Sequence, residues 1–310
     1  MPDSQNQPSQ PSTKIIKELH PYQKQALDIF TSAWARRNGD SQHERSNVSK
    51  ALARCTADAK DPDADVYIWS TILAIKQFAT THPQALDFLL LGYSDATRLY
   101  PDTVSNEYGH GPAAGLQQLK WWIVEESDGF QGLLFPTSIG SVHPTDRSNL
   151  SFMQWDVNEK LDQVLTQIND WRGERTSWII AAAIQARCFA LDIIRVNDGR
   201  QIEALIDAGF HRQRSRWSKA DFIGACVLLR GCAKSLISQL NAVAEGGQGQ
   251  SQDRSQAWKE ALHTYLVEDV KSSGKDFEIK YHAALALQNL KTGPRDETSD
   301  ALFLAHAWIF

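Results

Sequence analysis

Apolar residues recur at the spacing of an α-helix along most of this chain, and strict alternation of apolar and polar residues is almost absent. Pro21 and Pro83 each stand where a proline can open a helix, ahead of apolar residues at helical spacing. Asp63 and Ser46 can serve as N-caps of two further helices. In the helix after Asp63 we expect five residues to face inward: Val66, Trp69, Ile72, Leu73 and Phe78.

The second half of the chain carries longer and more regular apolar stripes. One stripe is formed by Val157, Leu161, Val164, Ile168 and Trp171. The stretch Trp178–Val196 is apolar nearly all round, which is typical of the buried central helix of a domain. A third stripe runs along Phe222–Val243, and we expect a partner helix beside it, either from this chain or from a second copy. Two more helices are predicted around Trp258 and Phe277, after a flexible loop at Glu245–Gln256.

The helical period fails between Ser127 and Ser151, where glycine and proline residues punctuate the chain after a helix predicted over Pro112–Glu126. We therefore predict an all-α fold, either as a single irregular domain of about ten helices or as two helical subdomains. The predicted parts are a polar tail at 1–12, a helical half at 13–127, a long irregular connection at 128–151, and a second helical half at 152–310 packed on the first.

Composition and charge narrow the class of protein. The formal net charge is −5 and both signs are spread along the chain, which argues against a nucleic-acid partner. The four cysteines form no CxxC pair, a pattern typical of free thiols in a reducing compartment. Residues 1–12 do not resemble a signal or transit peptide, and no apolar run reaches the ~20 residues of a membrane span. We expect a soluble, intracellular protein of the cytoplasm, without a membrane partner, and the sequence leaves the nucleus open as a second location.

Motifs that carry chemistry are incomplete where they occur. Asp61, Asp63 and Asp65 have the spacing of a calcium loop, but the glycine and the glutamate that such a loop needs are absent. The run Gly92-Tyr93-Ser94-Asp95-Ala96 is similar to a nucleophile elbow, yet no parallel sheet is predicted to hold it. No histidine pair has the spacing of a zinc helix, and no glycine-rich loop can cradle a phosphate. We therefore predict no catalytic residue, no metal site and no cofactor.

Two groups of residues are candidates for binding. The first is a basic cluster formed by Arg212, Arg214, Arg216 and Trp217. An aromatic ring beside guanidinium groups can stack on a base or hold an anion, and the alternative for this cluster is a solvated connection. The second group is a set of tryptophans that can line an apolar pocket between helices: Trp121, Trp122 and Trp178.

A series of short motifs runs through the region from Trp178 to Lys291. These motifs are Ala186-Arg187 on an apolar helix, Glu203-Ala204-Leu205 after it, the alanine-rich stretch Ala225–Ala233, and Trp258-Lys259 in a later helix. In these motifs and in helix order the chain resembles the fungal all-helical family known as domain of unknown function three-six-three-two. The resemblance implies a single all-helical domain and a fungal source. It brings no catalytic residues, because that family has no established chemistry.

The full apolar stripes and the lack of a catalytic set together favour binding over catalysis. We predict a helical binding or interaction protein whose partner is a protein or a small apolar ligand. A homodimer through the Phe222–Val243 helix is one form that this association can take. The competing prediction is an enzyme or carrier for a small apolar metabolite held in the tryptophan-lined pocket. A closed pocket with convergent polar groups would favour that alternative, whereas an exposed apolar patch on a solid core would favour a protein partner.

Overall fold

The computed structural model describes residues 19–37, 39–59, 63–100, 105–106, 109–110, 114–120, 123, 171–193, 200–211, 219–243, 250–268, 277–298 and 302. Within these residues the fold is all-α, as predicted. Apart from helices, they contain one pair of antiparallel two-residue strands, β1 (Ser105–Asn106) and β2 (Gly109–His110). The predicted tail, the predicted connection at 128–151 and most of the stripe that begins at Val157 lie outside the described residues.

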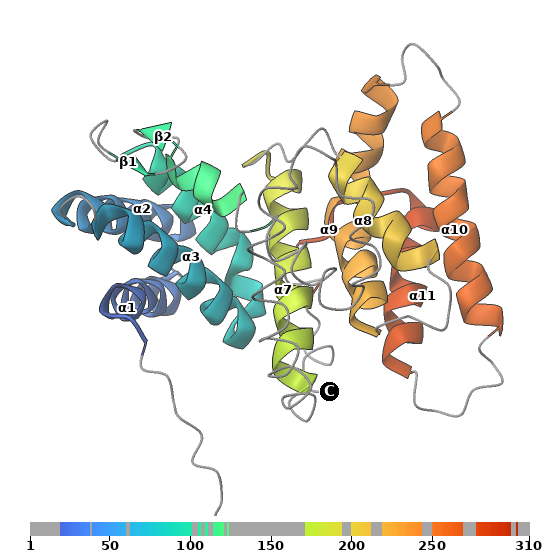
Figure 1. Ribbon diagram of the computed structural model, residues 1–310, viewed down its shortest axis with the longest axis horizontal. Helices are drawn as coiled ribbons and strands as arrows, with labels where there is room; N and C mark the ends of the chain where they lie inside the picture. Colours follow the sequence, from blue (N-terminus) through green and yellow to red (C-terminus); the bar gives the residue numbers. More distant parts are fainter. Residues whose placement is uncertain are drawn as a thin grey trace, which may run out of the picture.

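The first group of helices lies on one side of the molecule (Figure 1). It consists of α1 (Pro21–Arg36), α2 (Ser41–Asp58), α3 (Asp63–Thr81), a single 3-10 turn η1 (Pro83–Ala85) and α4 (Leu86–Thr97). Residues 114–120 are helical as well, and the hydroxyl of Tyr93 in α4 donates to the carbonyl of Gly115 at 2.9 Å. The predicted helix start at Pro21 is confirmed. Asp63 is the first residue of α3 and not the N-cap before it, and Pro83 opens the 3-10 turn η1 that leads into α4.

The predicted start of the second helix at Ser46 is wrong. The helix α2 begins at Ser41, because Asp40 accepts a hydrogen bond from the His43 N–H at 2.9 Å and so caps the first turn. The first turn of α2 is polar, and its first apolar residue lies well inside the helix. A start predicted from the apolar residues is therefore too late in the chain.

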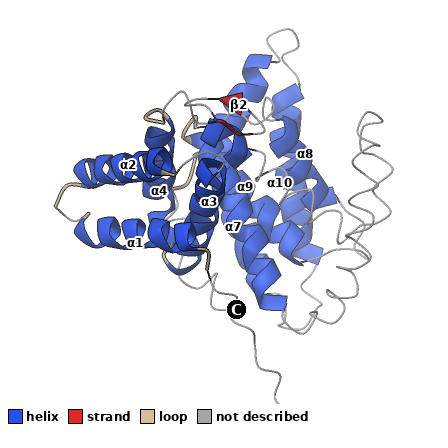
Figure 2. Cartoon of the chain, turned by 60° about the vertical axis from the view of Figure 1, so that its left-hand side comes forward, coloured by secondary structure: helices blue, strands red, loops and turns tan. Residues whose placement is uncertain are grey.

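The second group of helices begins with α7 (Trp171–Ala190), which stands between the two groups in Figures 1 and 2. It continues with α8 (Arg200–His211), α9 (Lys219–Val243), α10 (Gln250–Glu268) and α11 (Phe277–Thr292). The flexible loop predicted over Glu245–Gln256 is wrong from Gln250 onward, since those residues form the first turns of α10. Glutamine and arginine are good helix formers, and their polarity alone does not predict a loop.

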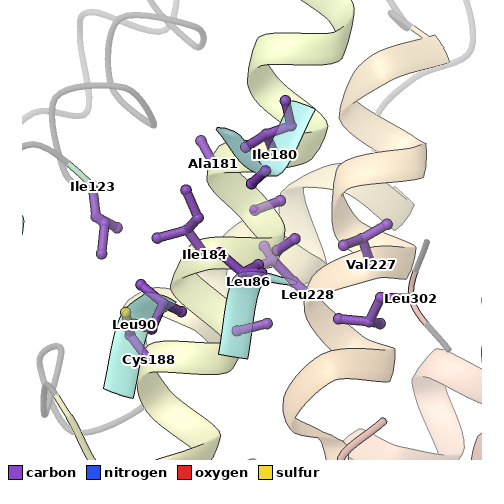
Figure 3. Close-up of a cluster of buried hydrophobic side chains, with 14 of the residues drawn as sticks. Leu86, Leu90, Ile123, Ile180, Ala181, Ile184, Cys188, Val227, Leu228 and Leu302 are labelled. Carbon is purple, nitrogen blue, oxygen red and sulfur yellow. The ribbon is translucent and has the colours of Figure 1, made fainter. Parts of the chain in front are cut away.

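The core gathers around α7 (Figure 3). Every residue from Ile179 to Cys188 is buried, which confirms the prediction of a central buried helix. The side chains that meet there come from α4, α7, α9 and the segment after α11: Leu86, Leu90, Ile180, Ala181, Ile184, Val227, Leu228 and Leu302. The helix α7 ends at Ala190 rather than at the predicted Val196. Asp192 adopts a left-handed conformation with φ 52°, and the Ile193 N–H donates to the carbonyl of Cys188, which closes the helix end.

The apolar stripe predicted along Phe222–Val243 packs inside the chain. The side chains that are at most 1% exposed include Phe222, Cys226, Leu229, Ala233 and Leu236. The helix α9 packs against α7, α8, α10 and α11, so this chain supplies partner helices for the stripe, and the homodimer through this helix stays a prediction. Among the described residues, Phe222–Ala242 is the one helix long and apolar enough to cross a membrane. A core helix meets the same criteria, and 67% of its apolar window is buried in the fold.

Candidate functional site

None of the seven predicted binding residues has a side chain within the described part of the chain. Six of them lie outside the described residues: Arg212, Arg214, Arg216, Trp217, Trp121 and Trp122. Trp178 lies in α7, and its side chain is outside the described part of the chain. The predicted basic cluster and tryptophan pocket therefore stay predictions.

A buried polar junction joins the two groups of helices. Arg187 of α7 forms a two-pronged ion pair with Asp87 of α4, with Nε 2.8 Å from Oδ1 and Nη2 3.1 Å from Oδ2. Its Nη1 donates to the carbonyl of Gly231 in α9 at 3.0 Å and to the carbonyl of Glu297 at 2.7 Å. The Arg187 side chain is 5% exposed, and a guanidinium buried to this extent needs such a set of acceptors.

A second buried arginine stands next to the first. Arg230 of α9 donates from Nε and Nη2 to Oε2 of Glu297, at 3.0 and 2.6 Å. Oε1 of Glu297 accepts from Nδ2 of Asn289 in α11 at 2.9 Å. The two charged side chains are 2% and 8% exposed, so removal of either one would leave a buried charge without its counter-charge.

Residues 293–298, which we call the strap, follow α11 and cross this junction. Gly293 ends α11 with φ +110°, a conformation that glycine adopts without a steric penalty. The carboxylate of Asp296 accepts hydrogen bonds from the N–H and the hydroxyl of Ser235. The side chain of Asn289 bonds both the N–H and the carbonyl of Arg295. Past the strap, Leu302 is buried.

The polar groups of the junction bond one another. The hydroxyl of Ser235 donates to Asp296. Arg187 is paired with the carboxylate of Asp87, and Arg230 with that of Glu297. Burial raises the pKa of the thiols of Cys188, Cys226 and Cys232 far above the usual value, so they stay protonated and are poor nucleophiles. No group of three or more histidine, cysteine, aspartate or glutamate residues that could hold a metal occurs within the described residues.

A smaller polar cluster joins α8 to α10. Arg254 of α10 forms ion pairs with Glu203, at 2.9 Å, and with Asp207, both in α8. The indole N–H of Trp258 donates to Oδ1 of Asp207 at 2.7 Å, and this tryptophan is fully buried. Trp258 is therefore a packing anchor whose polar atom is satisfied. The Ser94 of the elbow-like run lies in the middle of helix α4 and is buried, so it does not form a nucleophile elbow.

The outer face of α3 departs most clearly from the predicted burial. Val66 is 41% exposed and Leu73 is 40% exposed, although both were expected to face inward, while Ile72 and Phe78 are buried as predicted. Trp69 is half-buried between the two exposed residues. We call Val66, Trp69 and Leu73 the α3 outer face. The prediction failed because α3 is apolar on more than one side, so periodicity alone did not distinguish its buried side from its exposed side.

One buried amide in α7 is unsatisfied. Neither the oxygen nor the nitrogen of the Gln185 side chain has a hydrogen-bond partner, and the residue has no exposed surface. Buried polar side chains are nearly always bonded to protein, water or a ligand. Gln185 lies seven residues after Trp178, two helical turns along the same face of α7.

Comparisons with known protein families, with curated proteins and with solved structures found no match to this chain.

Proposed function

We propose that this protein acts by binding other proteins, and that the α3 outer face is its binding surface. The observation that supports this proposal is the exposure of Val66 and Leu73 on a helix whose other sides pack into the core. Surface helices of globular proteins usually place charged residues on the side that faces water. From Val66 to Thr81, Lys76 is the only charged residue of α3.

The partner that best fits this surface is a second copy of the same chain in the antiparallel direction. Val66 and Leu73 are equally spaced about one midpoint of α3. A two-fold axis through that point would place Val66 of one copy opposite Leu73 of the other. Antiparallel helices also pair their dipoles favourably.

The size of the surface sets the expected strength. A contact between two helices over a few turns falls at the low end of specific interfaces, below about 1,200 Å² in total. We therefore expect a weak and reversible association, with a dissociation constant of roughly 10 to 100 μM, which corresponds to about 5–7 kcal/mol of binding free energy.

The experiment is sedimentation equilibrium of the full chain over a range of concentrations that spans this dissociation constant. The test variant is Val66→Glu/Leu73→Glu, which places charges in the centre of the α3 outer face. The matched control is Gln25→Glu/Ser32→Glu, two exposed positions of α1 with the same spacing of seven residues. The proposal expects the wild type and the control to form dimers and the test variant to stay monomeric.

Two results would overturn this assignment. A wild type that is monomeric at the highest concentration would exclude self-association. A test variant that dimerises as the wild type does would place the interface elsewhere. If the test variant loses stability against urea while the wild type is monomeric, the α3 outer face is covered by a segment of its own chain and is not a binding surface.

A second candidate function is the binding of a small, largely apolar molecule, and Gln185 is the observation that favours it. A free amide oxygen and amide nitrogen in an apolar setting can bind a carbonyl, hydroxyl or amide group of a ligand. Gln185→Leu is the test, since it removes both polar atoms and nearly keeps the volume. An increase of about 1–3 kcal/mol in the unfolding free energy of the ligand-free protein would show that the amide is not paired. Loss of a ligand found by native mass spectrometry of the purified wild type would then assign the site.

We also propose that the chain belongs with the fungal helical family that it resembles, and that it works in the cytoplasm. The support for the first proposal is that the shared motifs fall on residues with definite roles. Arg187 centres the buried junction, while Glu203 and Trp258 take part in the polar cluster between α8 and α10. The support for the second is the set of free cysteines, three of which are buried.

A further inference from the structure

Helix α9 is interrupted at a single residue. Cys232 has φ −142° and ψ 21°, which are not helical values, and helical segments lie on both sides of it within Lys219–Val243. Interruptions of this kind have identifiable causes, such as a proline or a group that inserts into the ladder of backbone hydrogen bonds. No proline occurs in this segment, Gly231 precedes the interruption, and groups from outside the helix contact it.

Groups from outside the helix bond the backbone around the interruption. In a regular helix the N–H of Ser235 donates to the carbonyl of Gly231. Here the carboxylate of Asp296 accepts the Ser235 N–H at 3.0 Å, and the Gly231 carbonyl accepts from Nη1 of Arg187 at 3.0 Å. The carbonyl of Arg230 accepts from the N–H of Glu297 at 2.9 Å. Two of these three partners belong to the strap.

The strap thus behaves as a cap for the second part of α9. An aspartate oxygen on a backbone N–H at the start of a helical segment is the usual N-cap interaction, although here the aspartate comes from a distant part of the chain. The ion pair between Glu297 and Arg230 fixes the strap beside the interruption. Without the strap, the Ser235 N–H and the Arg230 carbonyl would each lose a partner in a buried setting, which costs free energy.

The same groups would regain partners if α9 became continuous. A straight helix pairs the Ser235 N–H with the Gly231 carbonyl and the Lys234 N–H with the Arg230 carbonyl. We propose that α9 is a two-state element: it is interrupted at Cys232 when the strap is docked, and it becomes a continuous helix when the strap leaves. The strap is then a latch that selects the shape of α9.

A change in α9 would reach other parts of the fold. The helix α11 packs on α9, and α10 packs on α11 and α9. Straightening at Cys232 would turn the second part of α9, with these two helices, against α7 and α8. Whether the strap is bound to Arg187 and Arg230 would therefore determine the position of α10 and α11.

The test uses the full chain labelled with ¹³C at cysteine, which gives one signal from each of the four cysteines. Replacement of Cys232 by alanine identifies its signal. The test variant is Asp296→Ala/Glu297→Ala, which removes both carboxylates of the strap. The control is Arg295→Ala, because the exposed side chain of Arg295 takes no part in the junction, which uses only its backbone.

The proposal expects the Cα chemical shift of Cys232 to move from a non-helical to a helical value in the test variant and to stay unchanged in the control. Faster hydrogen exchange at the N–H of Glu297 and Leu302 shows that the strap has left. An unchanged Cys232 shift with the strap released would overturn the proposal, since the interruption would then be intrinsic to α9. If the double variant does not fold, Asp296→Ala alone leaves both arginine ion pairs in place. Its Cys232 signal must then show a second, helical population, and a single unchanged signal overturns the proposal as well.

Discussion

The close approach of α7 and α9 at Gly231 gives the sharpest prediction about stability. A Cβ atom added at Gly231 would lie 2.6 Å from Cβ of Ala186 and 3.1 Å from Cδ1 of Leu302. Two carbon atoms are at their best separation at about 3.5–4.0 Å. In Gly231→Ala the two helices must therefore move apart by roughly 1 Å, at the point where Arg187 bonds the Gly231 carbonyl.

The expected magnitude follows from three terms. Overpacking of a core contact costs about 1–3 kcal/mol, and the stretched hydrogen bond from the Arg187 guanidinium adds a part of the ~1.5–3 kcal/mol that such a bond contributes. Alanine is favoured over glycine within a helix by about 1 kcal/mol, which offsets part of this loss. We expect Gly231→Ala to lower the unfolding free energy by about 1–3 kcal/mol.

Urea denaturation followed by far-ultraviolet circular dichroism measures this change. The matched control is Gly39→Ala, because the nearest atom to its added Cβ is the Arg36 carbonyl oxygen at 3.9 Å, and its stability should change by less than about 1 kcal/mol. Ala186→Gly removes the closer of the two contacts, so it should recover stability in the Gly231→Ala background although it destabilises the wild type. A coupling of about 1 kcal/mol or more in this cycle is expected. Additive effects, or a Gly231→Ala variant as stable as the control, would refute the close packing at this position.

Three further predictions concern the buried charges, thiols and phenols. Glu297→Ala should lower the unfolding free energy by about 3–5 kcal/mol, because it leaves the charge of Arg230 buried without its partner. Asp58→Ala, in the exposed pair with Arg54, should lower it by less than about 1 kcal/mol. Equal losses of unfolding free energy in urea denaturation would contradict this prediction. In a thiol-reagent titration near neutral pH the half-buried Cys55 should react first, and three thiols whose pKa is raised by burial should react only on unfolding: Cys188, Cys226 and Cys232. Burial also raises the phenol pKa of three tyrosines, so their contribution to stability is complete below the usual pKa of about 10 and is lost above it. Unfolding free energy should fall as pH rises beyond that value. Phenolate absorbance in the folded protein that accounts for all seven tyrosines at the ordinary pKa would contradict this for Tyr67, Tyr93 and Tyr100.

The helical spacing of apolar residues predicted where the main helices lie, but it predicted less well where they end and which of their sides are buried. The apolar run after Trp178 identified α7 as the central helix, and the stripe from Phe222 identified α9, because burial on nearly all sides leaves a clear local signal. The end of α7 was missed, since Asp192 takes the left-handed conformation that glycine usually marks, and apolar residues continue past it. The two sides of α3 were not separated, because both are apolar.

The buried junction was beyond the reach of the sequence alone. Arg187 and Asp87 are 100 positions apart, and Arg230 and Glu297 are 67 apart, so no local spacing connects them. A partial signal was present, since Arg187 and Arg230 are charges inside strongly apolar stretches. Charges at such positions are rarely buried unless they are paired, so each of them indicates a partner elsewhere in the chain. Arg230 is 2% exposed because its ion pair with Glu297 of the strap covers it.

The binding role of the α3 outer face is tested most directly by disulfide trapping between two copies. In a Cys55→Ser background, which leaves the three buried thiols, Val66→Cys and Leu73→Cys chains are prepared separately and then oxidised alone and as a mixture. The antiparallel pairing predicts a cross-linked dimer in the mixture, with peptide mapping that joins position 66 to position 73, and little cross-linking in either chain alone. No dimer in the mixture, or links that join each position to itself, would contradict the proposed interface.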